Sequence, residues 1–152
     1  MSYNIWSVNG FGICTDDICT DRDRLLSFIN QAPVFEKDFK EWIDGFAEDP
    51  DDITLEEMEE YEDEYGYTGI APIMSAVIYE LERIDLTVVT DVCGNTFLLL
   101  EPAYPWTNLS DEERNLTEVS LSDIFVKYCR MLTDAEIKPG YECSGPAETA
   151  IK

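Results

Sequence analysis

Histidine is absent from the sequence of 152 residues. This absence excludes Ser-His-Asp and Cys-His catalysis, the HExxH zinc motif and any proton relay through imidazole. Carboxylates can still act as acid and base, but pairs of carboxylates arise by chance among thirty-three Asp and Glu residues. The sequence therefore carries no catalytic signature, and we expect a protein that is not an enzyme.

Basic residues are scarce, because ten Lys and Arg stand against thirty-three Asp and Glu, which gives a formal net charge of −23. The interval between Lys40 and Arg83 contains no basic residue and holds fifteen acidic ones. Such a chain lacks the Lys and Arg contacts to phosphate that dominate nucleic-acid affinity, and anionic lipid repels it. We expect neither direct nucleic-acid binding nor membrane binding, and we expect a basic protein surface as the partner.

Long apolar runs and secretion signals are also missing. No apolar stretch approaches the ~20 residues that a membrane helix needs, and MSYNIWSV has neither the basic nor the apolar region of a signal peptide. The cysteines are odd in number and contain no C-x-x-C pair; they are Cys14, Cys19, Cys93, Cys129 and Cys143. Free thiols and a cytoplasmic location are therefore expected.

No metal or cofactor site is predicted. An EF-hand loop that starts at Asp49 would have Ile53 as its fifth ligand and Thr54 in place of the required glycine. Cys14 and Cys19 have a spacing that some zinc sites use, but a zinc site is not expected, because the remaining cysteines do not pair up and the chain has no histidine. The stretch NGFG at residues 9–12 lacks the lysine and the glycine spacing of a phosphate-binding loop.

Apolar periodicity and turn residues predict an α+β fold. Two β-hairpins are expected, one over residues 3–15 with Asn9-Gly10 as its turn, and one formed by LTVVTDV and TFLLLEP around residues 93–95. About five helices are expected, over residues 20–32, 34–46, 55–65, 70–81 and 120–132, with a short last strand at YEC. These elements predict a single domain over residues 1–143, in which an antiparallel sheet of two hairpins packs with the helices, and a polar tail over residues 144–152.

The acidic segment is EDPDDITLEEMEEYEDEYGY, residues 48–67, which has eleven acidic residues and no basic one. Thr54 and Glu57 form the pattern of a capping box, and Ile53 and Met58 form that of a hydrophobic staple. Gly66 stands where a glycine often ends a helix. Residues 55–65 are therefore predicted to form one helix with an apolar face, and not a disordered tail.

The carboxylates of the acidic segment are the candidate partner-binding residues. On the predicted helix, carboxylates one turn apart would stand ~5–6 Å from each other, a spacing that can imitate the phosphates of a nucleic acid. This pattern favours a non-enzymatic inhibitor that blocks the basic surface of a nucleic-acid-binding effector or nuclease. The candidates are Glu48, Asp49, Asp51, Asp52, Glu56, Glu57, Glu59, Glu60, Glu62, Asp63 and Glu64.

Three other interpretations stay open. The acidic segment can serve solubility alone, or the chain can be an immunity protein that blocks a cationic toxin nuclease. A different class is a small-ligand protein, or an enzyme that uses carboxylates, with a pocket near Tyr104 and Trp106. The same two aromatic side chains could instead contact a partner, because aromatic residues are common interface anchors.

Two stretches, YNIWSVNGFGICTDDI and LLLEPAYPW, resemble small proteins of phages and mobile elements of Gram-positive bacteria. Small acidic proteins of this kind include anti-CRISPR and other anti-defence inhibitors, several of which mimic nucleic acid. The resemblance implies an inhibitor, and it assigns no role to individual residues.

Overall fold

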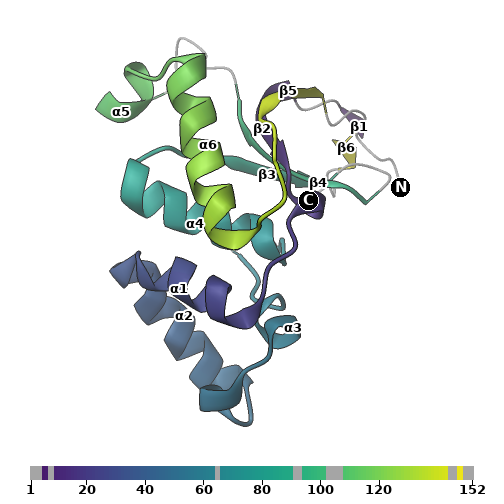
Figure 1. The fold of residues 1–152 in the computed structure, drawn as a ribbon, viewed down its shortest axis with the longest axis vertical. Coiled ribbons are helices and arrows are strands. Elements are labelled where there is room, and N and C mark those ends of the chain that lie inside the picture. The colour runs from purple at the N-terminus through teal and green to yellow at the C-terminus, as the bar shows by residue number, and fades with distance from the viewer. Residues whose placement is uncertain are drawn as a thin grey trace.

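The computed structural model describes residues 5–6, 9–63, 66–90, 94–101, 108–143 and 147–148. Within these residues the chain mixes helices with antiparallel strands, as an α+β protein does (Figure 1). The strands are β1 (Ile5–Trp6), β2 (Asn9–Cys14), β3 (Thr87–Thr90), β4 (Thr96–Leu100), β5 (Gly140–Cys143) and β6 (Ala147–Glu148). The helices are α1 (Arg22–Asn30), α2 (Pro33–Phe46), α3 (Leu55–Met58), α4 (Ile70–Glu82), α5 (Asp111–Arg114) and α6 (Glu118–Leu132), with 3-10 turns η1 (Thr15–Asp17) and η2 (Pro50–Asp52).

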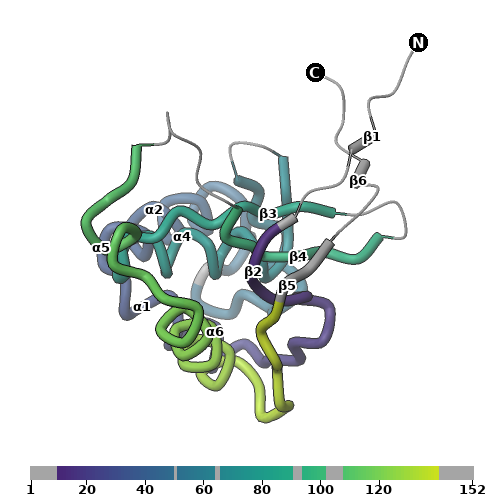
Figure 2. The backbone as a smooth tube through the Cα atoms, turned by 90° about the horizontal axis from the view of Figure 1, so that it is seen from above, coloured from purple at the N-terminus to yellow at the C-terminus, as the bar shows by residue number. Residues whose placement is uncertain are grey.

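The main sheet has the strand order β3-β4-β2-β5, and each neighbouring pair is antiparallel. Thr90 of β3 pairs with Thr96 of β4, so the strands expected on either side of residues 93–95 are adjacent. β2 lies inside the sheet, with β4 on one side and β5 on the other. Figure 2 shows the helices gathered on one side of this sheet.

The hairpin predicted over residues 3–15 is wrong. Asn9 and Gly10 lie inside β2, where they pair with Cys143 and Glu142, and β1 pairs with β6 instead of with β2. Both edges of β2 are taken by β4 and β5, so pairing between distant segments overrides the local turn signal of Asn-Gly. The stretch 144–152, expected to be a polar tail, contributes Ala147–Glu148 as β6.

Apolar side chains of the sheet alternate between its two faces. Val88 and Leu98 belong to the main core, whereas their neighbours Val89 and Leu99 belong to a second, smaller apolar cluster. Gly12 of β2 lies so close to β4 that a Cβ at this position would collide with the carbonyl oxygen of Leu98. Glycine is therefore required where these two strands meet.

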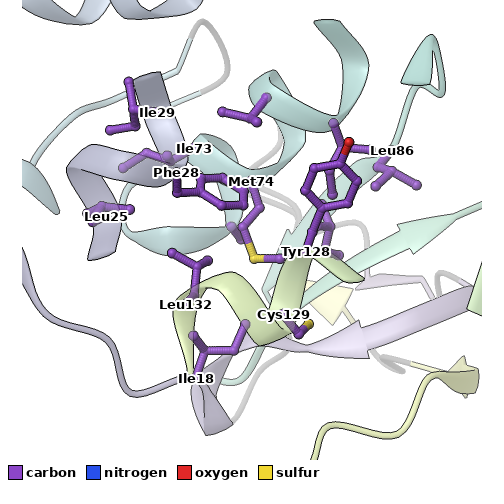
Figure 3. Packing of buried hydrophobic residues seen from close by; sticks show 14 of the residues in the cluster. Ile18, Leu25, Phe28, Ile29, Ile73, Met74, Leu86, Tyr128, Cys129 and Leu132 are labelled. Atoms are coloured by element: carbon purple, nitrogen blue, oxygen red, sulfur yellow. The ribbon is translucent and has the colours of Figure 1, made fainter. Parts of the chain in front are cut away.

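The main core joins α1, α2, α4 and α6 to the sheet. Phe28 of α1 and Tyr128 of α6 pack edge to face with their ring centroids 6.0 Å apart, and both are almost fully buried. Met74 of α4 lies in the same cluster (Figure 3). The Tyr128 hydroxyl donates a hydrogen bond to the Glu82 carboxylate at 3.0 Å, which satisfies the polar end of this buried ring.

Side chains from other helices cap two helix ends. Glu80 of α4 accepts hydrogen bonds from the backbone N–H groups of Val34 and Phe35, at 3.0 and 2.8 Å, and so caps the start of α2. Arg24 of α1 donates to two backbone carbonyl oxygens near the end of α6, at 3.0 and 3.2 Å. These bonds fix α2 and α6 relative to their neighbours.

Most of the predicted helices are confirmed. The helices predicted over residues 20–32, 34–46, 70–81 and 120–132 correspond to α1, α2, α4 and α6, while the short α5 has no counterpart in the prediction. α4 is buried along its first turns, whereas Tyr79 and Leu81 in its last turns are 51% and 39% exposed. Among the described residues, no helix is both long and apolar enough to cross a lipid bilayer.

Candidate protein-binding surface

The acidic segment begins as the sequence predicts. The Thr54 hydroxyl accepts a hydrogen bond from the N–H of Glu57, and the Glu57 carboxylate accepts one from the N–H of Thr54, each at 3.2 Å. Ile53 and Met58, the two residues of the predicted staple, are both buried in the main core. The capping box is thus confirmed, and the two apolar side chains tie the segment to the core.

The helix predicted over residues 55–65 is wrong, because α3 ends at Met58. The backbone tightens there: the N–H of Glu60 donates to the carbonyl of Glu57, and the N–H of Tyr61 donates to that of Met58, each at 3.2 Å. Both bonds span three residues, as in a 3-10 turn. The predicted helical row of carboxylates, spaced one turn apart, therefore does not form.

A tight turn follows α3. Glu62 pairs with Thr68 in an antiparallel bridge, and the N–H of Asp63 donates to the carbonyl of Tyr67 at 3.0 Å. Gly66 has a φ of +87°, which glycine adopts without strain, and its N–H donates to the carbonyl of Asp63 at 3.1 Å. Gly66 therefore lies between the bridged residues Glu62 and Thr68, and not at the helix end that the sequence predicts.

Charge and packing explain why α3 is short. A longer helix would place Glu56 one turn from Glu60 and Glu59 one turn from Asp63, and like charges at this spacing destabilise a helix. The segment has no lysine or arginine to offset the repulsion. Where the helix ends, Tyr61 is free to pack against the aromatic side chains of α2.

Tyr61 joins an aromatic cluster on α2. Its ring centroid lies 5.5 Å from that of Phe35 and 5.4 Å from those of Phe39 and Trp42. The ring of Trp42 stacks on that of Phe46, with centroids 4.7 Å apart and planes 12° apart. Phe39 is buried and Phe46 is 45% exposed, so the cluster runs from the core to the surface. The sequence predicts one apolar face along α2 and gives no sign that its last turn is open to solvent.

The candidate carboxylates lie mainly on the surface of the segment that follows α2. Glu57, Glu59 and Asp63 are half-buried, and the exposed ones are Glu48, Asp49, Asp51, Asp52, Glu56, Glu60 and Glu62. Glu64 lies outside the described residues, as do Tyr104 and Trp106 with the pocket expected near them. Within the described part of the chain, none of the exposed carboxylates named here forms an ion pair with a lysine or arginine.

The negative charges of this surface act on neighbouring groups. Partial burial, and then the charge of Glu56, raises the pKa of Glu59 above its usual value of 4.5. Partial burial, and then the charges of Asp38 and Asp63, raises the pKa of Tyr61. Both groups therefore lose their protons less readily than usual, mainly because burial disfavours the charged form and also because nearby carboxylates repel a further negative charge. A cation from a partner would reduce this repulsion.

One basic side chain holds the acidic segment to α1. The guanidinium of Arg22 donates to the backbone carbonyl of Asp51 at 2.8 Å and lies 3.8 Å from the carboxylate of Asp23. Arg22 thus anchors the backbone of η2 and leaves the side-chain carboxylate of Asp51 exposed. The backbone beneath the carboxylates is fixed at η2 by Arg22 and at α3 by the capping box.

A separate groove of about 670 Å³ lies between α4 and β3. Tyr67, Tyr79 and Leu86 line it, with Asp63 and Asp85 also on its wall. In the part of the chain that the structure describes, no group of three or more Cys, Asp or Glu side chains is arranged to hold a metal ion.

The fold and this surface define a small, strongly acidic α+β protein whose carboxylates are held on a folded backbone. Comparison of the chain with protein-family models, with curated proteins and with solved structures finds no match.

Proposed function

We propose that the chain is a non-enzymatic inhibitor that binds the basic surface of a nucleic-acid-binding protein through its acidic segment. The observation that supports this proposal most strongly is the set of exposed carboxylates that have no lysine or arginine partner among the described residues. Lysine and arginine side chains of a partner would supply the missing cations. Attraction of this kind accelerates association and weakens as salt screens it.

The folded backbone of the acidic segment supports binding over solubility alone. Arg22 and the capping box of Thr54 and Glu57 order the chain before any partner arrives. An ordered surface loses less conformational entropy on binding than a disordered acidic tail does. Because α3 ends at Met58, the proposed mimicry rests on the density of negative charge and not on a helical spacing of carboxylates.

An immunity protein would use the same surface, because a toxin nuclease also presents a basic site for nucleic acid. In both cases the chain and nucleic acid compete for one basic surface. Competition with duplex DNA therefore tests the proposed class, and the identity of the captured protein distinguishes an effector from a toxin.

The test compares two variants that have each lost four negative charges. The acidic-segment variant carries Asp49→Asn, Asp52→Asn, Glu56→Gln and Glu60→Gln, and all four residues are exposed in the structure. The control variant carries Glu112→Gln, Glu118→Gln, Asp123→Asn and Glu136→Gln, which are exposed elsewhere on the chain. Each protein is immobilised and exposed to a lysate of the native host at low salt, and bound protein is eluted with duplex DNA.

The wild-type chain and the control variant are expected to capture the same DNA-displaceable protein, and the acidic-segment variant is expected to lose it. Equal capture by both variants would contradict a role for this surface in binding. Capture of a protein that duplex DNA does not displace would contradict nucleic-acid mimicry. Circular dichroism of both variants shows that a loss of capture does not come from unfolding.

A further inference from the structure

We propose that Trp42 and Phe46, at the end of α2, form a docking site for an arginine side chain of the basic partner. The inference rests on the proposed function and deepens it, because it names the group that the partner inserts. It adds an aromatic anchor to a surface that otherwise acts through charge alone.

The two rings offer a flat apolar surface beside the acidic segment. They stack with centroids 4.7 Å apart and planes only 12° apart. Trp42 is held from inside by Phe39 and Tyr61, whose ring centroids each lie 5.4 Å from its own. Phe46 is 45% exposed, and the ring contact that places it is the one with Trp42. One end of the stack is thus fixed in the protein and the other is open.

Carboxylates on the same helix complete the site. Asp38 lies one helical turn before Trp42, and residues at this spacing share a helix face. Glu41 lies one helical turn before Gly45, and the carboxylates of Asp38 and Glu41 are both exposed. A guanidinium can lie flat on an aromatic ring while its N–H groups donate to a carboxylate. A lysine ammonium is a compact, strongly hydrated charge and fits such a site less well.

Gly45 leaves the helix surface beside the two rings open. It lies within α2, between the two aromatic residues, and a Cβ added there would meet no atom within 4 Å. Neither packing nor a positive φ therefore requires glycine at this position, although glycine weakens a helix relative to alanine. The missing side chain leaves the outer surface beside Trp42 and Phe46 open to close approach by another backbone.

The charge of the chain favours a basic occupant over a second copy of itself. Two copies that met at this face would bring together two chains of formal net charge −23, and their exposed Asp38 and Glu41 carboxylates would repel. The guanidinium of an arginine can instead pair with these carboxylates and stack on the aromatic rings at the same time.

The test uses nona-arginine and nona-lysine, which carry equal charge, with the full chain. Trp6→Phe and Trp106→Phe leave Trp42 as the sole tryptophan of three, so that its fluorescence reports on the site. Nona-arginine is expected to bind about fivefold more tightly than nona-lysine, a preference within the range of a cation–π contact, and to change the emission of Trp42. In this background Phe46→Leu keeps an apolar side chain and is expected to abolish the preference, while Phe46→Tyr keeps the ring and retains it.

Gly45→Gln places a side chain on the open surface and is expected to weaken nona-arginine binding about threefold or more, with nona-lysine binding little changed. Equal affinity for the two peptides, or an arginine preference that survives Phe46→Leu, would overturn the arginine site. In those cases the proposed function still stands if the four substitutions of the acidic-segment variant weaken the binding of both peptides. If neither nona-arginine nor nona-lysine bound the chain, both the arginine site and the proposed function would be contradicted.

Discussion

Replacement of Glu80 by glutamine is expected to destabilise the helix that carries the aromatic site. α2 begins without a side-chain cap of its own, because its N-cap residue is Ala32. Glu80 supplies the cap from α4 by accepting the N–H groups of Val34 and Phe35, at 3.0 and 2.8 Å. Glutamine keeps one acceptor oxygen and turns an NH₂ group toward the second N–H.

The expected loss in unfolding free energy is about 2 kcal/mol. A hydrogen bond to a charged group contributes roughly 1.5–3 kcal/mol, and a negative charge at a helix N-terminus contributes about 0.3–1 kcal/mol. Glutamine loses one of the two bonds and the charge, but Glu80 is only partly buried, so the lower end of this range applies. For a domain of this size, 2 kcal/mol corresponds to a Tm lower by about 4–8 °C.

Urea unfolding followed by circular dichroism measures the change. Glu136→Gln is the matched control, because Glu136 is exposed in a loop and its substitution removes the same charge. The control is expected to be neutral or slightly stabilising, since it relieves self-repulsion in a chain of net charge −23. A difference of less than about 0.5 kcal/mol between the two variants would refute the capping argument.

Gly12→Ala is expected to prevent stable folding, because its Cβ would collide with the backbone of β4. Gly140→Ala, at the residue that pairs with Gly12, is expected to be tolerated, because a Cβ there has open space. Circular dichroism measures both variants, and equal stability of the two would contradict the close approach of β2 to β4. Glu59→Gln is expected to raise the unfolding free energy at neutral pH, because burial and the charge of Glu56 raise the pKa of this carboxyl; unchanged or lower stability would contradict that reasoning. Burial raises the pKa of the Cys129 thiol from 9.0 to about 12, so the unfolded chain releases this proton first. The stability that Cys129 contributes relative to Cys129→Ala is therefore present below pH 9 and falls between pH 9 and 12, and a pH-independent difference in unfolding free energy would refute this.

The elements that depend on nearby residues are the ones that the sequence predicts well. The i, i+4 and i+8 spacing of Phe35, Phe39 and Ile43 marks the buried face of α2, because an α-helix brings such positions to one side. The capping box of Thr54 and Glu57 is also local, and the structure contains it. In both cases the interacting groups are within about two helical turns of each other in the chain.

The sheet could not be predicted in the same way. The Asn9-Gly10 pair favours a hairpin turn by its backbone preference, yet both residues lie within β2. The strands that flank β2 come from residues 96–100 and 140–143, far along the chain. A turn signal reports only the preference of its own residues, and it carries no information on strands that compete from a distance.

The candidate surface is partly readable from the sequence. Its excess of negative charge follows directly from composition, but the three-residue spacing of Met58 and Tyr61 suits both an α-helix and a 3-10 turn. Repulsion between carboxylates and the packing of Tyr61 on α2 decide for the turn. The exposure of Phe46 could not be predicted, because its spacing continues the apolar face of α2 although the core ends before it.

The most direct test of the central claim is the affinity of the captured partner, purified, for the wild-type chain and the two variants that each lack four negative charges. The control variant is expected to bind like the wild-type chain, while the acidic-segment variant is expected to bind at least about tenfold more weakly, with a slower association rate and a smaller dependence on salt. Equal affinity of the two variants, each with a shallow salt dependence, would contradict the central claim.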